Sequence, residues 1–354
     1  MRLRLGAAAL CMALLLTGCG AAAQESSPDT GTKAEVPSAS VDIFAMDTYM
    51  TVTCYGERCE EAVEAAENEI RRLDDLLSVG NEDSEISRIN RDGTGTVSED
   101  TAEMVAEALS LCHTTGGAFD ITVYPLMELW GFTTGDYQIP DQEAIDGLLP
   151  LVDDSVIALE GGSATLPADA QLDLGAVAKG YAGDRAAEIL QDAGVTSALL
   201  NLGSSTIRDI GSKPDGSPWR IALQDPNDTS AYAGVVSATD LSIDTSGGYE
   251  RYFEGDDGEI YWHILDPDTG YPAKNGLISV TVLSDSALTG DGLSTALFVM
   301  GLSNAIDYWR TNGGFEFIFI TDQNEIYVSQ GAESLFQPLG SYETAEIHVV
   351  TEAS

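Results

Sequence analysis

Positively charged residues are scarce in this chain of 354 residues: 16 Lys and Arg stand against 58 Asp and Glu, a formal net charge of −42. A surface this acidic repels nucleic acid and anionic lipid headgroups, so neither is expected as a general partner. A phosphate-bearing ligand would need local positive charge or a metal ion in order to bind. Any site for such a ligand therefore has to be built around a few cations.

Histidine and cysteine are also rare, with three and five residues. Beyond residue 19 the cysteines are Cys54, Cys59 and Cys112, which make neither a disulfide framework nor a metal-ligand spacing. Cys54 and Cys59 are close enough in sequence to pair, but ordinary unpaired cysteines are the favoured interpretation. The motifs G-x-S-x-G, H-E-x-x-H, Walker A and G-x-G-x-x-G are absent, which leaves several common enzyme classes without support.

Long apolar runs are missing except at the N-terminus, MRLRLGAAALCMALLLTGCG (1–20). Two arginines precede a short apolar run that ends in L-T-G-C, which is typical of a cleaved leader rather than a membrane span. The order L-T-G-C resembles the bacterial lipobox, so residues 1–18 are predicted to be a lipoprotein signal peptide and Cys19 to be acylated, as by palmitate. The alternative is an ordinary secretory leader with an incidental cysteine.

The rest of the chain divides by composition. Residues 19–40 are rich in Ala, Ser, Thr and Pro without apolar periodicity, and are predicted to be a flexible tether. Globular sequence follows over 41–342, which is enough for a sizeable core, and a C-terminal tail is expected at 343–354.

Helices and strands alternate along the globular part. Apolar spacing predicts helices at 60–77, 98–117, 175–194 and 284–301, with Ser98 as an N-cap and Gly116-Gly117 as a stop. An early strand is expected at 44–56, and a long β-rich segment at 219–282 has Asp-Pro and Gly-Gly turns. This mixture predicts an α+β fold, with antiparallel sheets packed by helices in two intimately joined lobes.

Two stretches suggest an anion site and a metal site. In QLDLGAVAKGYAGDRAAEIL (171–190), a strand is expected to end at Asp173, and Lys179 lies one turn into the helix that follows. In LTGDGLSTALFVMG (288–301), Asp291 and Thr295 share a helix face and offer hard oxygen ligands suited to Mg²⁺. Taken singly, the first stretch is equally compatible with a strand–helix junction and a solvated lysine. The second, taken singly, is better explained by an acidic first turn with a buried threonine.

Two further stretches carry aromatic and titratable groups. GGAFDITVYPLMELWGF (116–132) could cradle a flat heterocycle, although core aromatics after a helix turn are the alternative. In SIDTSGGYERYFEGDDGEIYWHILDPDTGYP (242–272), His263 ends a strand before an Asp-Pro turn, where a general base would be presented. A lone strand histidine is more often a core residue, and the nearby Ser246, Tyr249 and Arg251 identify no triad.

In their order and wording these motifs resemble the FAD:protein FMN transferases, the ApbE family. The resemblance runs from FAMDTYMTV through LSVGNEDSEISRIN, GGAFDITVYPLMELWGF, LDLGAVAKGYAGD, LNLGSSTIRDIG and HILDPDTGYP to GDGLSTAL, nearly the whole globular part. It implies an ApbE-like fold and the residues that would bind FAD: Met46, Ala118, Phe119, Asp120, Asp173, Lys179 and Ile264. It also implies that the carbonyl of Ala176, with Asp291 and Thr295 and assisted by Ser294, holds Mg²⁺, and that His263 acts in catalysis.

The implied reaction transfers the FMN part of FAD to a threonine hydroxyl of an acceptor protein and releases AMP. His263 would take the hydroxyl proton, a role that a near-neutral pKa suits. The alternatives are Mg²⁺-dependent hydrolysis of FAD to FMN and AMP, and flavin binding without turnover. Acceptors would be flavin-bearing subunits of membrane electron-transfer complexes, met at the extracytoplasmic face by a protein that lipid anchors to the membrane.

The chain departs from the family pattern at two positions. Gly80 stands where many relatives place a tyrosine over the flavin, so Tyr55 or Tyr124 is a candidate replacement. Gly248 stands where relatives often carry an acid, which leaves the carboxylate partner of His263 unassigned.

Overall fold

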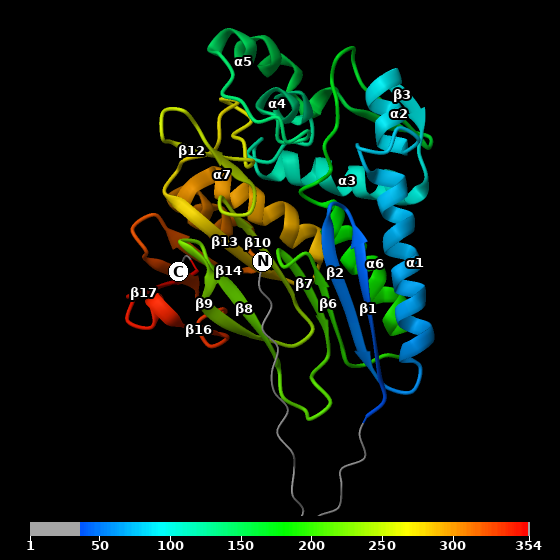
Figure 1. Ribbon diagram of the computed structural model, residues 1–354, viewed down its shortest axis with the longest axis vertical. Helices are drawn as coiled ribbons and strands as arrows, with labels where there is room; N and C mark the ends of the chain where they lie inside the picture. Colours follow the sequence, from blue (N-terminus) through cyan, green and yellow to red (C-terminus); the bar gives the residue numbers. More distant parts are fainter. Residues whose placement is uncertain (1–35, 353–354) are drawn as a thin grey trace, which may run out of the picture. The chain divides into compact units, whose positions relative to one another are not determined.

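A nine-stranded sheet is the centre of the protein, whose computed structural model describes residues 36–352. All neighbouring strands are antiparallel except β15 and β17, which are parallel. Its strands, in spatial order, are β1 (Ser38–Ala45), β2 (Thr48–Tyr55), β6 (Ala198–Leu202), β7 (Thr206–Ile210), β10 (Ser242–Gly247), β13 (Leu277–Ser284), β14 (Glu316–Thr321), β15 (Ile326–Ser329) and β17 (Ile347–Val350) (Figure 1).

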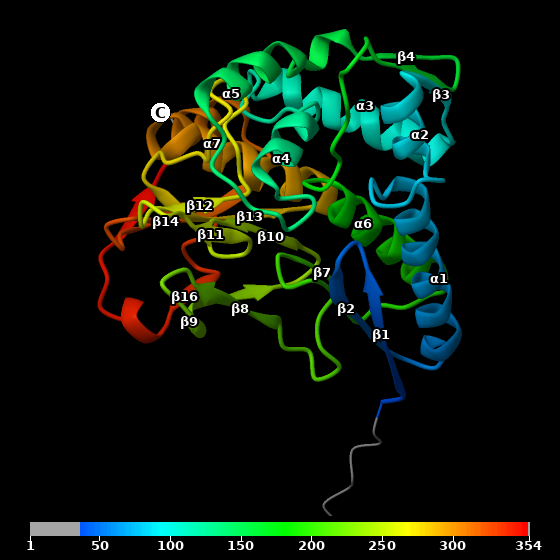
Figure 2. The ribbon, with the colours of Figure 1, turned by 45° about the horizontal axis from the view of Figure 1, so that its top comes forward.

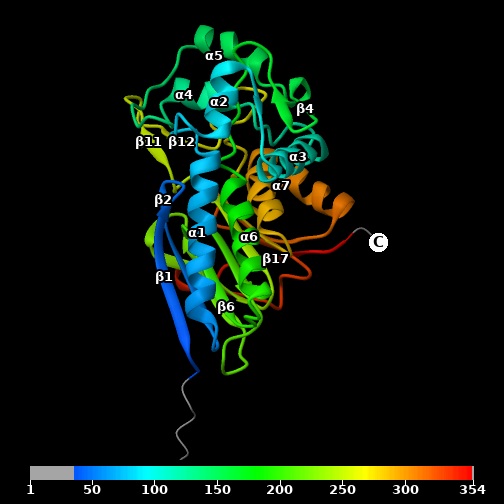
Figure 3. The ribbon, with the colours of Figure 1, turned by 90° about the vertical axis from the view of Figure 1, so that its right-hand side faces the viewer.

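The two faces of this sheet are covered differently. The helices α1 (Cys59–Leu77), α6 (Ala178–Asp192) and α7 (Ala287–Asn312) lie side by side over one face (Figure 3). The other face packs against a three-stranded sheet through a separate apolar cluster that includes Ile221 and Ile243. That sheet has the order β16 (Phe336–Pro338), β9 (Asp228–Ala238) and β8 (Trp219–Asp225). Along β10, residues therefore alternate between the helices and the small sheet.

The remaining elements gather beyond one end of the large sheet, at the top of Figure 1 and toward the viewer in Figure 2. They are α2 (Glu85–Asp92), α3 (Glu99–Thr114), α4 (Tyr124–Trp130), α5 (Gln142–Leu148), the small sheet of β3 (Thr94–Thr96), β5 (Ser163–Thr165) and β4 (Ala158–Glu160), and the hairpin of β11 (Tyr252–Glu254) and β12 (Ile260–Trp262). Trp130 anchors this region, because its indole nitrogen donates to the carbonyl of Gly270 at 2.8 Å while its ring packs against Tyr261. Between residues 36 and 352 there are also three short 3-10 turns: η1 (Leu149–Leu151), η2 (Asp154–Val156) and η3 (Gly340–Tyr342).

The predicted α+β class is confirmed, and so are the helix at 60–77 and the N-cap at Ser98, whose hydroxyl accepts from the amide of Thr101. The single strand expected at 44–56 is instead a hairpin, because Met46 and Asp47 adopt positive φ angles and reverse the chain. The strand expected to end at Asp173 is a loop. The last helix continues past 301 to Asn312, with a break at Gly301 (φ 72°).

The described residues form one compact unit from Val36 onward, and its ends differ from the expected boundaries. Strand β1 begins at Ser38, inside the segment 19–40 that was predicted to be a tether. The segment 343–354, expected as a tail, contributes β17 to the large sheet, so that prediction was wrong for residues 347–350. Among the described helices, none is both long and apolar enough to cross a bilayer.

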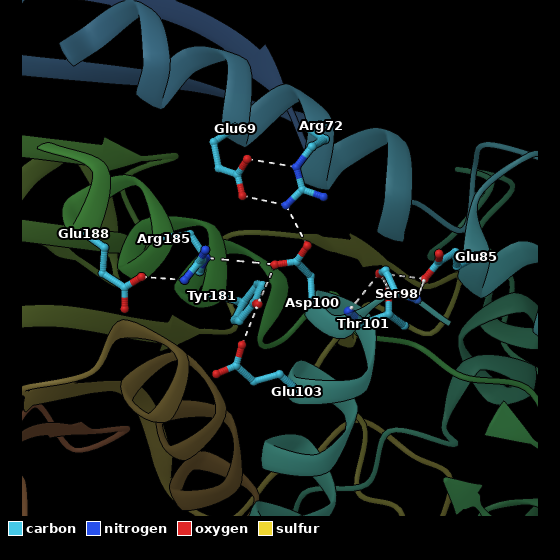
Figure 4. Close-up of polar contacts among 10 residues, drawn as sticks. All are labelled: Glu69, Arg72, Glu85, Ser98, Asp100, Thr101, Glu103, Tyr181, Arg185 and Glu188. Carbon is cyan, nitrogen blue, oxygen red and sulfur yellow. Dashed lines mark hydrogen bonds and ion pairs between the residues drawn. The ribbon is translucent and has the colours of Figure 1, made fainter. Parts of the chain in front are cut away.

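A polar network fixes α6 against α1 and α3 (Figure 4). The hydroxyl of Tyr181 on α6 lies 3.0 Å from a carboxylate oxygen of both Asp100 and Glu103 on α3. Asp100 in turn bonds to Arg72 of α1 at 2.7 Å, and Arg72 forms a second ion pair with Glu69. Asp100 of α3 therefore links α6 to α1 next to the first turn of α6.

Cys54 and Cys59 form a disulfide that links the end of β2 to the first residue of α1, with their Cα atoms 5.6 Å apart. This corrects the expectation that both are ordinary unpaired residues, and the reason is geometric: β2 ends and α1 begins within a single tight turn. Cys112 is buried and free. Closing such a short loop stabilises the fold by about 2 kcal/mol.

The disulfide predicts a specific peptide. Trypsin cleaves after Arg58, between the two cysteines, so an unreduced digest should contain peptide 34–58 covalently joined to peptide 59–71. Mass spectrometry before and after reduction checks this, because reduction should split the joined species into its two parts. Recovery of both peptides already alkylated without reduction would show that the bond does not form.

Candidate active site

The candidate site is built where α6 and α7 begin. Lys179 on α6 and Asp291 on α7 form an ion pair, with the lysine nitrogen 3.2 and 3.3 Å from the two carboxylate oxygens. Both side chains are largely buried, with 19% and 7% of their surfaces exposed. A buried carboxylate that lost such a partner would destabilise the fold by about 3–5 kcal/mol, so the pair ties the two helices together.

The backbone of α6 contributes to the same contact. The amide of Gly180 donates to Asp291 Oδ2 at 3.1 Å, whereas in a continuing helix it would bond to the carbonyl of Ala176. That carbonyl is therefore released from the regular pattern at the helix start. A side chain at Gly180 would collide with the carbonyl of Ala287, so glycine is what permits α6 and α7 to approach this closely.

Strand β10 presents a polar face toward α7, next to the ion pair of Lys179 and Asp291. Ser242, Asp244 and Ser246 alternate along the strand and point toward α7. Asp244 is fully buried: its Oδ2 accepts from Ser242 at 2.7 Å, while its Oδ1 has no hydrogen-bond partner. A side chain on Gly290 would collide with the Asp244 carboxylate, which shows how closely α7 is pressed against β10.

Burial and charge shape the pKa values here. Burial lowers the pKa of Lys179, but the carboxylates of Asp291 and Glu250 outweigh it, so the net pKa lies above its usual value and the ammonium stays charged. Burial raises the pKa of Asp291, with Lys179 and the Gly180 amide opposing that change. The pKa of Asp244 rises well above its usual range because of burial and the neighbouring Asp291. Two carboxyl groups thus share Lys179 as a counter-charge.

His263 is the first residue after β12 and is half-buried. Its amide and its ring nitrogen Nδ1 both contact the carbonyl of Arg251, at 3.1 and 3.2 Å. Because a carbonyl can only accept, the neutral ring carries its hydrogen on Nδ1 and leaves Nε2 as the free base nitrogen. Burial, with the nearby charges of Arg251 and Lys179, lowers the pKa of His263 to about 4, below the near-neutral value expected from the sequence.

Glu250 is a site residue that the sequence reasoning missed. It interacts electrostatically with Lys179, Asp291 and Arg251. Loss of hydration raises its pKa above the usual range, although the residue keeps an exposed surface, and the two cations oppose that rise. The sequence did hold a signal for it. Relatives often carry an acid at the position of Gly248, and Glu250 lies only two residues further along the same stretch, 242–272.

Asp173 lies in a loop that connects the site to the segment 116–123. Its amide donates to the carbonyl of Ile121 at 2.7 Å, and its carboxylate accepts from the amide of Gly175 at 2.7 Å. Burial raises its pKa, while the Gly175 amide, Arg251 and Lys179 oppose the rise. The structure therefore brings Asp173, Asp291 and His263 each within electrostatic reach of Lys179.

Of the two aromatic residues considered as replacements at Gly80, one lies near this cluster. Tyr124 begins α4, and the charge of Asp173 contributes to raising its pKa, after burial and Glu128. Tyr55 instead packs against Trp219, 6.1 Å between ring centroids, on the side of the three-stranded sheet. Tyr124 is thus the better placed of the two.

The segment after α3 supplies the next three candidates. Phe119 is 4% exposed and packs in the main core. Asp120 is also buried, and its carboxylate accepts from the amide and hydroxyl of Thr122 and from the amide of Asp154. Ala118 lines a cavity of about 480 Å³ together with Asp266 and the break in α7 at Gly301. Asp120 therefore orders the loop that carries Ala118.

The last flavin candidates lie on turns. Met46 sits at the tip of the β1–β2 hairpin, where its amide donates to the carboxylate of Asp74 on α1 at 3.0 Å. Ile264 follows His263 and is buried, with its carbonyl accepting from the amide of Ala273. Cys19, the expected lipidation residue, lies outside the described residues.

Oxygen atoms suited to Mg²⁺ lie on the first turns of α7 and just ahead of α6. Thr295 lies one helical turn beyond Asp291 and is half-buried, whereas Ser294 is fully buried. The carboxylate of Asp291, the hydroxyl of Thr295 and the released carbonyl of Ala176 are all hard donors, so the residues fit that ion. No cluster of three or more His, Cys, Asp or Glu with metal-binding geometry occurs between residues 36 and 352, so a metal here would rely on carbonyl and hydroxyl oxygens as well.

The environment of His263 predicts its titration. Because burial and the Arg251 cation disfavour the imidazolium, its ring should be protonated only near pH 4, well below an exposed histidine. An NMR titration of the histidine ring resonances measures this, with the signal assigned by its loss in His263→Gln.

Arg251→Gln is the matched control for this titration. It removes the cation but keeps the backbone carbonyl that holds Nδ1, so the pKa of His263 should rise toward its ordinary value. A wild-type pKa at or above 6.5 would contradict the proposed environment.

Comparison with known proteins agrees with this architecture. The sequence model of the ApbE family matches residues 46–319. The FAD:protein FMN transferase of Vibrio cholerae is 38% identical over 240 residues, 66% of this chain and 71% of the relative. The crystal structure of the ApbE protein from Thermotoga maritima superimposes with a TM-score of 0.78 at 30% identity, covering 84% of this chain and 99% of that one. The flavin transferase ApbE from Vibrio cholerae gives a TM-score of 0.76 at 30% identity, covering 85% of this chain and 100% of that one. The chain therefore belongs to the ApbE family.

Proposed function

We propose that this protein transfers the FMN part of FAD to a threonine hydroxyl of an acceptor protein and releases AMP. The observation that carries the proposal is that Asp173, Asp291 and a neutral His263 all interact with Lys179, at the start of α6. The names of the curated relatives support the same chemistry at the level of the family.

FAD would bind beside this cluster. Its diphosphate carries negative charge into a protein of formal net charge −42, so Lys179 and Arg251 supply the local positive charge that binding requires. The flavin would extend toward the loops that carry Ala118 and Met46, with Tyr124 as the aromatic neighbour in place of the residue missing at Gly80.

Mg²⁺ would be held by the carbonyl of Ala176, the carboxylate of Asp291 and the hydroxyl of Thr295. When bound, this ion supplies positive charge that stabilises the diphosphate in the transition state. In this structure the Lys179 ammonium is paired with the Asp291 carboxylate. If a metal ion were to neutralise that carboxylate, the ammonium would become available to contact the substrate.

His263 would act as the general base. Its Nε2 accepts the proton of the acceptor threonine, the threonine oxygen forms a bond to the FMN-side phosphorus, and the bond from that phosphorus to the bridging oxygen breaks to release AMP. The proton then passes from Nε2 to solvent. With a pKa of about 4 the ring is neutral at neutral pH and can accept a proton, although it is a weaker base than an imidazole with the near-neutral pKa that suits this role.

We also propose where in the cell the protein acts. Acylation at Cys19 would anchor it by lipid to the extracytoplasmic face of a membrane, where acceptor subunits of electron-transfer complexes are found. The disulfide between Cys54 and Cys59 supports an oxidising compartment, because such bonds are rare in the cytosol.

The transfer can be tested in one incubation. The purified protein is mixed with FAD, Mg²⁺ and an acceptor subunit, and both AMP release and covalent flavin fluorescence on the acceptor are followed. We expect AMP and labelled acceptor in equal amounts, and neither after chelation with EDTA. His263→Ala should lower the rate by about 10²–10⁴-fold, which is what a general base contributes.

Each other outcome identifies a different function. AMP with free FMN and an unlabelled acceptor indicates a hydrolase, and absence of AMP with bound FAD indicates a flavin-binding protein. A rate for His263→Ala within a fewfold of wild type would remove this residue from the role of base. His348→Ala is the matched control, because His348 lies in β17 against Tyr327, away from this site.

A further inference from the structure

Three hydroxyl groups meet between β10 and α7. The hydroxyl oxygen of Ser246 lies 2.7 Å from that of Ser294 and 3.1 Å from that of Thr295. The Ser294 hydroxyl also lies 2.8 Å from the backbone carbonyl of Asp291. Ser246 is 9% exposed and Ser294 is fully buried, so solvent does not supply alternative partners for Ser294.

Counting hydrogens gives these contacts a direction. Each hydroxyl carries one hydrogen, and a carbonyl can only accept. The Ser294 hydroxyl therefore donates its hydrogen to the backbone carbonyl of Asp291. The contact between Ser246 and Ser294 then requires Ser246 as donor, and the contact between Thr295 and Ser246 requires Thr295 as donor. The order is therefore Thr295 to Ser246 to Ser294 to the carbonyl of Asp291.

This order fixes how Thr295 presents its oxygen. Its hydrogen points toward β10, so its lone pairs face away from the strand, on the helix face that it shares with Asp291. A metal ligand needs a free lone pair directed at the ion, and a hydroxyl that rotates freely would first have to be oriented. In this structure the orientation exists before any ion binds.

We propose that Ser246 is a positioning residue for the metal site, because it holds the Thr295 hydroxyl with its lone pairs toward the ion. In the same proposal, Ser294 sets the direction of this chain of hydrogen bonds and does not bind the metal. This inference rests on the proposed function, in which Asp291 and Thr295 hold Mg²⁺. Strand β10 suits the task because it lies in the middle of the large sheet, paired with β7 and β13.

The test measures metal affinity without FAD or turnover. Mn²⁺, a paramagnetic substitute for Mg²⁺, is titrated into the purified protein, and the free ion is followed by electron paramagnetic resonance. Ser246→Ala should weaken binding about tenfold, the lower end of what supporting residues around a metal contribute. Ser246→Cys, which keeps the shape of the side chain but donates weakly, should also lose affinity and provides a second variant if the alanine form does not fold.

Two comparisons complete the design. Thr245→Val is the matched control, because it removes the neighbouring hydroxyl of β10, which pairs with Thr281 on the opposite face at 2.9 Å, and affinity should stay unchanged. Ser294→Ala should lose about as much as Ser246→Ala and less than Thr295→Ala.

The results separate the inference from the function on which it rests. Folded Ser246 variants that bind Mn²⁺ as wild type does would overturn the positioning role, and a loss in Ser294→Ala equal to that in Thr295→Ala would make Ser294 a ligand. Wild-type protein that binds no Mn²⁺ yet releases AMP from FAD would overturn the metal site and this inference with it. Absence of both binding and AMP release would overturn the proposed function itself.

Discussion

The buried carboxylate of Asp291 is the constraint on which the site depends. It lies where α7 meets α6, a helix from a distant part of the chain, and it is stabilised by a lysine and a backbone amide of α6. Helix α6 is itself linked to α3 and α1 by the network around Asp100, and α7 is pressed against β10 of the large sheet. A charge that is costly to bury thereby becomes the point where the main layers of the fold are joined.

Much of the fold could be predicted from local sequence patterns. Apolar periodicity located α1, and the serine ahead of α3 marked its start, because both signals act within a few residues. The hairpin at Met46 was not predicted, because it depends on two non-glycine residues that adopt positive φ angles. Strand β17 was missed since four residues gain strand structure only by pairing with β15, itself defined by tertiary contacts.

The candidate site shows the same division. The order of the motifs predicted that Asp173, Lys179, Asp291 and His263 are site residues. It did not predict their protonation or their hydrogen-bond partners. The partner of His263 is a backbone carbonyl, which only the β11–β12 register places there, so a search for a carboxylate in the sequence could not find it. Likewise, the direction of the hydroxyl chain follows from distances between a strand and a helix separated by some fifty residues, as Ser246 and Thr295 are.

The length of strand β1 sets how far the turn at Met46 lies from the start of the strand at Ser38. It runs without interruption from Ser38 to Ala45 and ends at the turn that carries Met46. Eight residues of strand span roughly 25 Å at about 3.3 Å per residue. Because β1 is hydrogen-bonded to β2 along its whole length, this distance is rigid. The hairpin tip that carries Met46 is therefore held at a fixed distance of about one strand length from Ser38, where the strand begins.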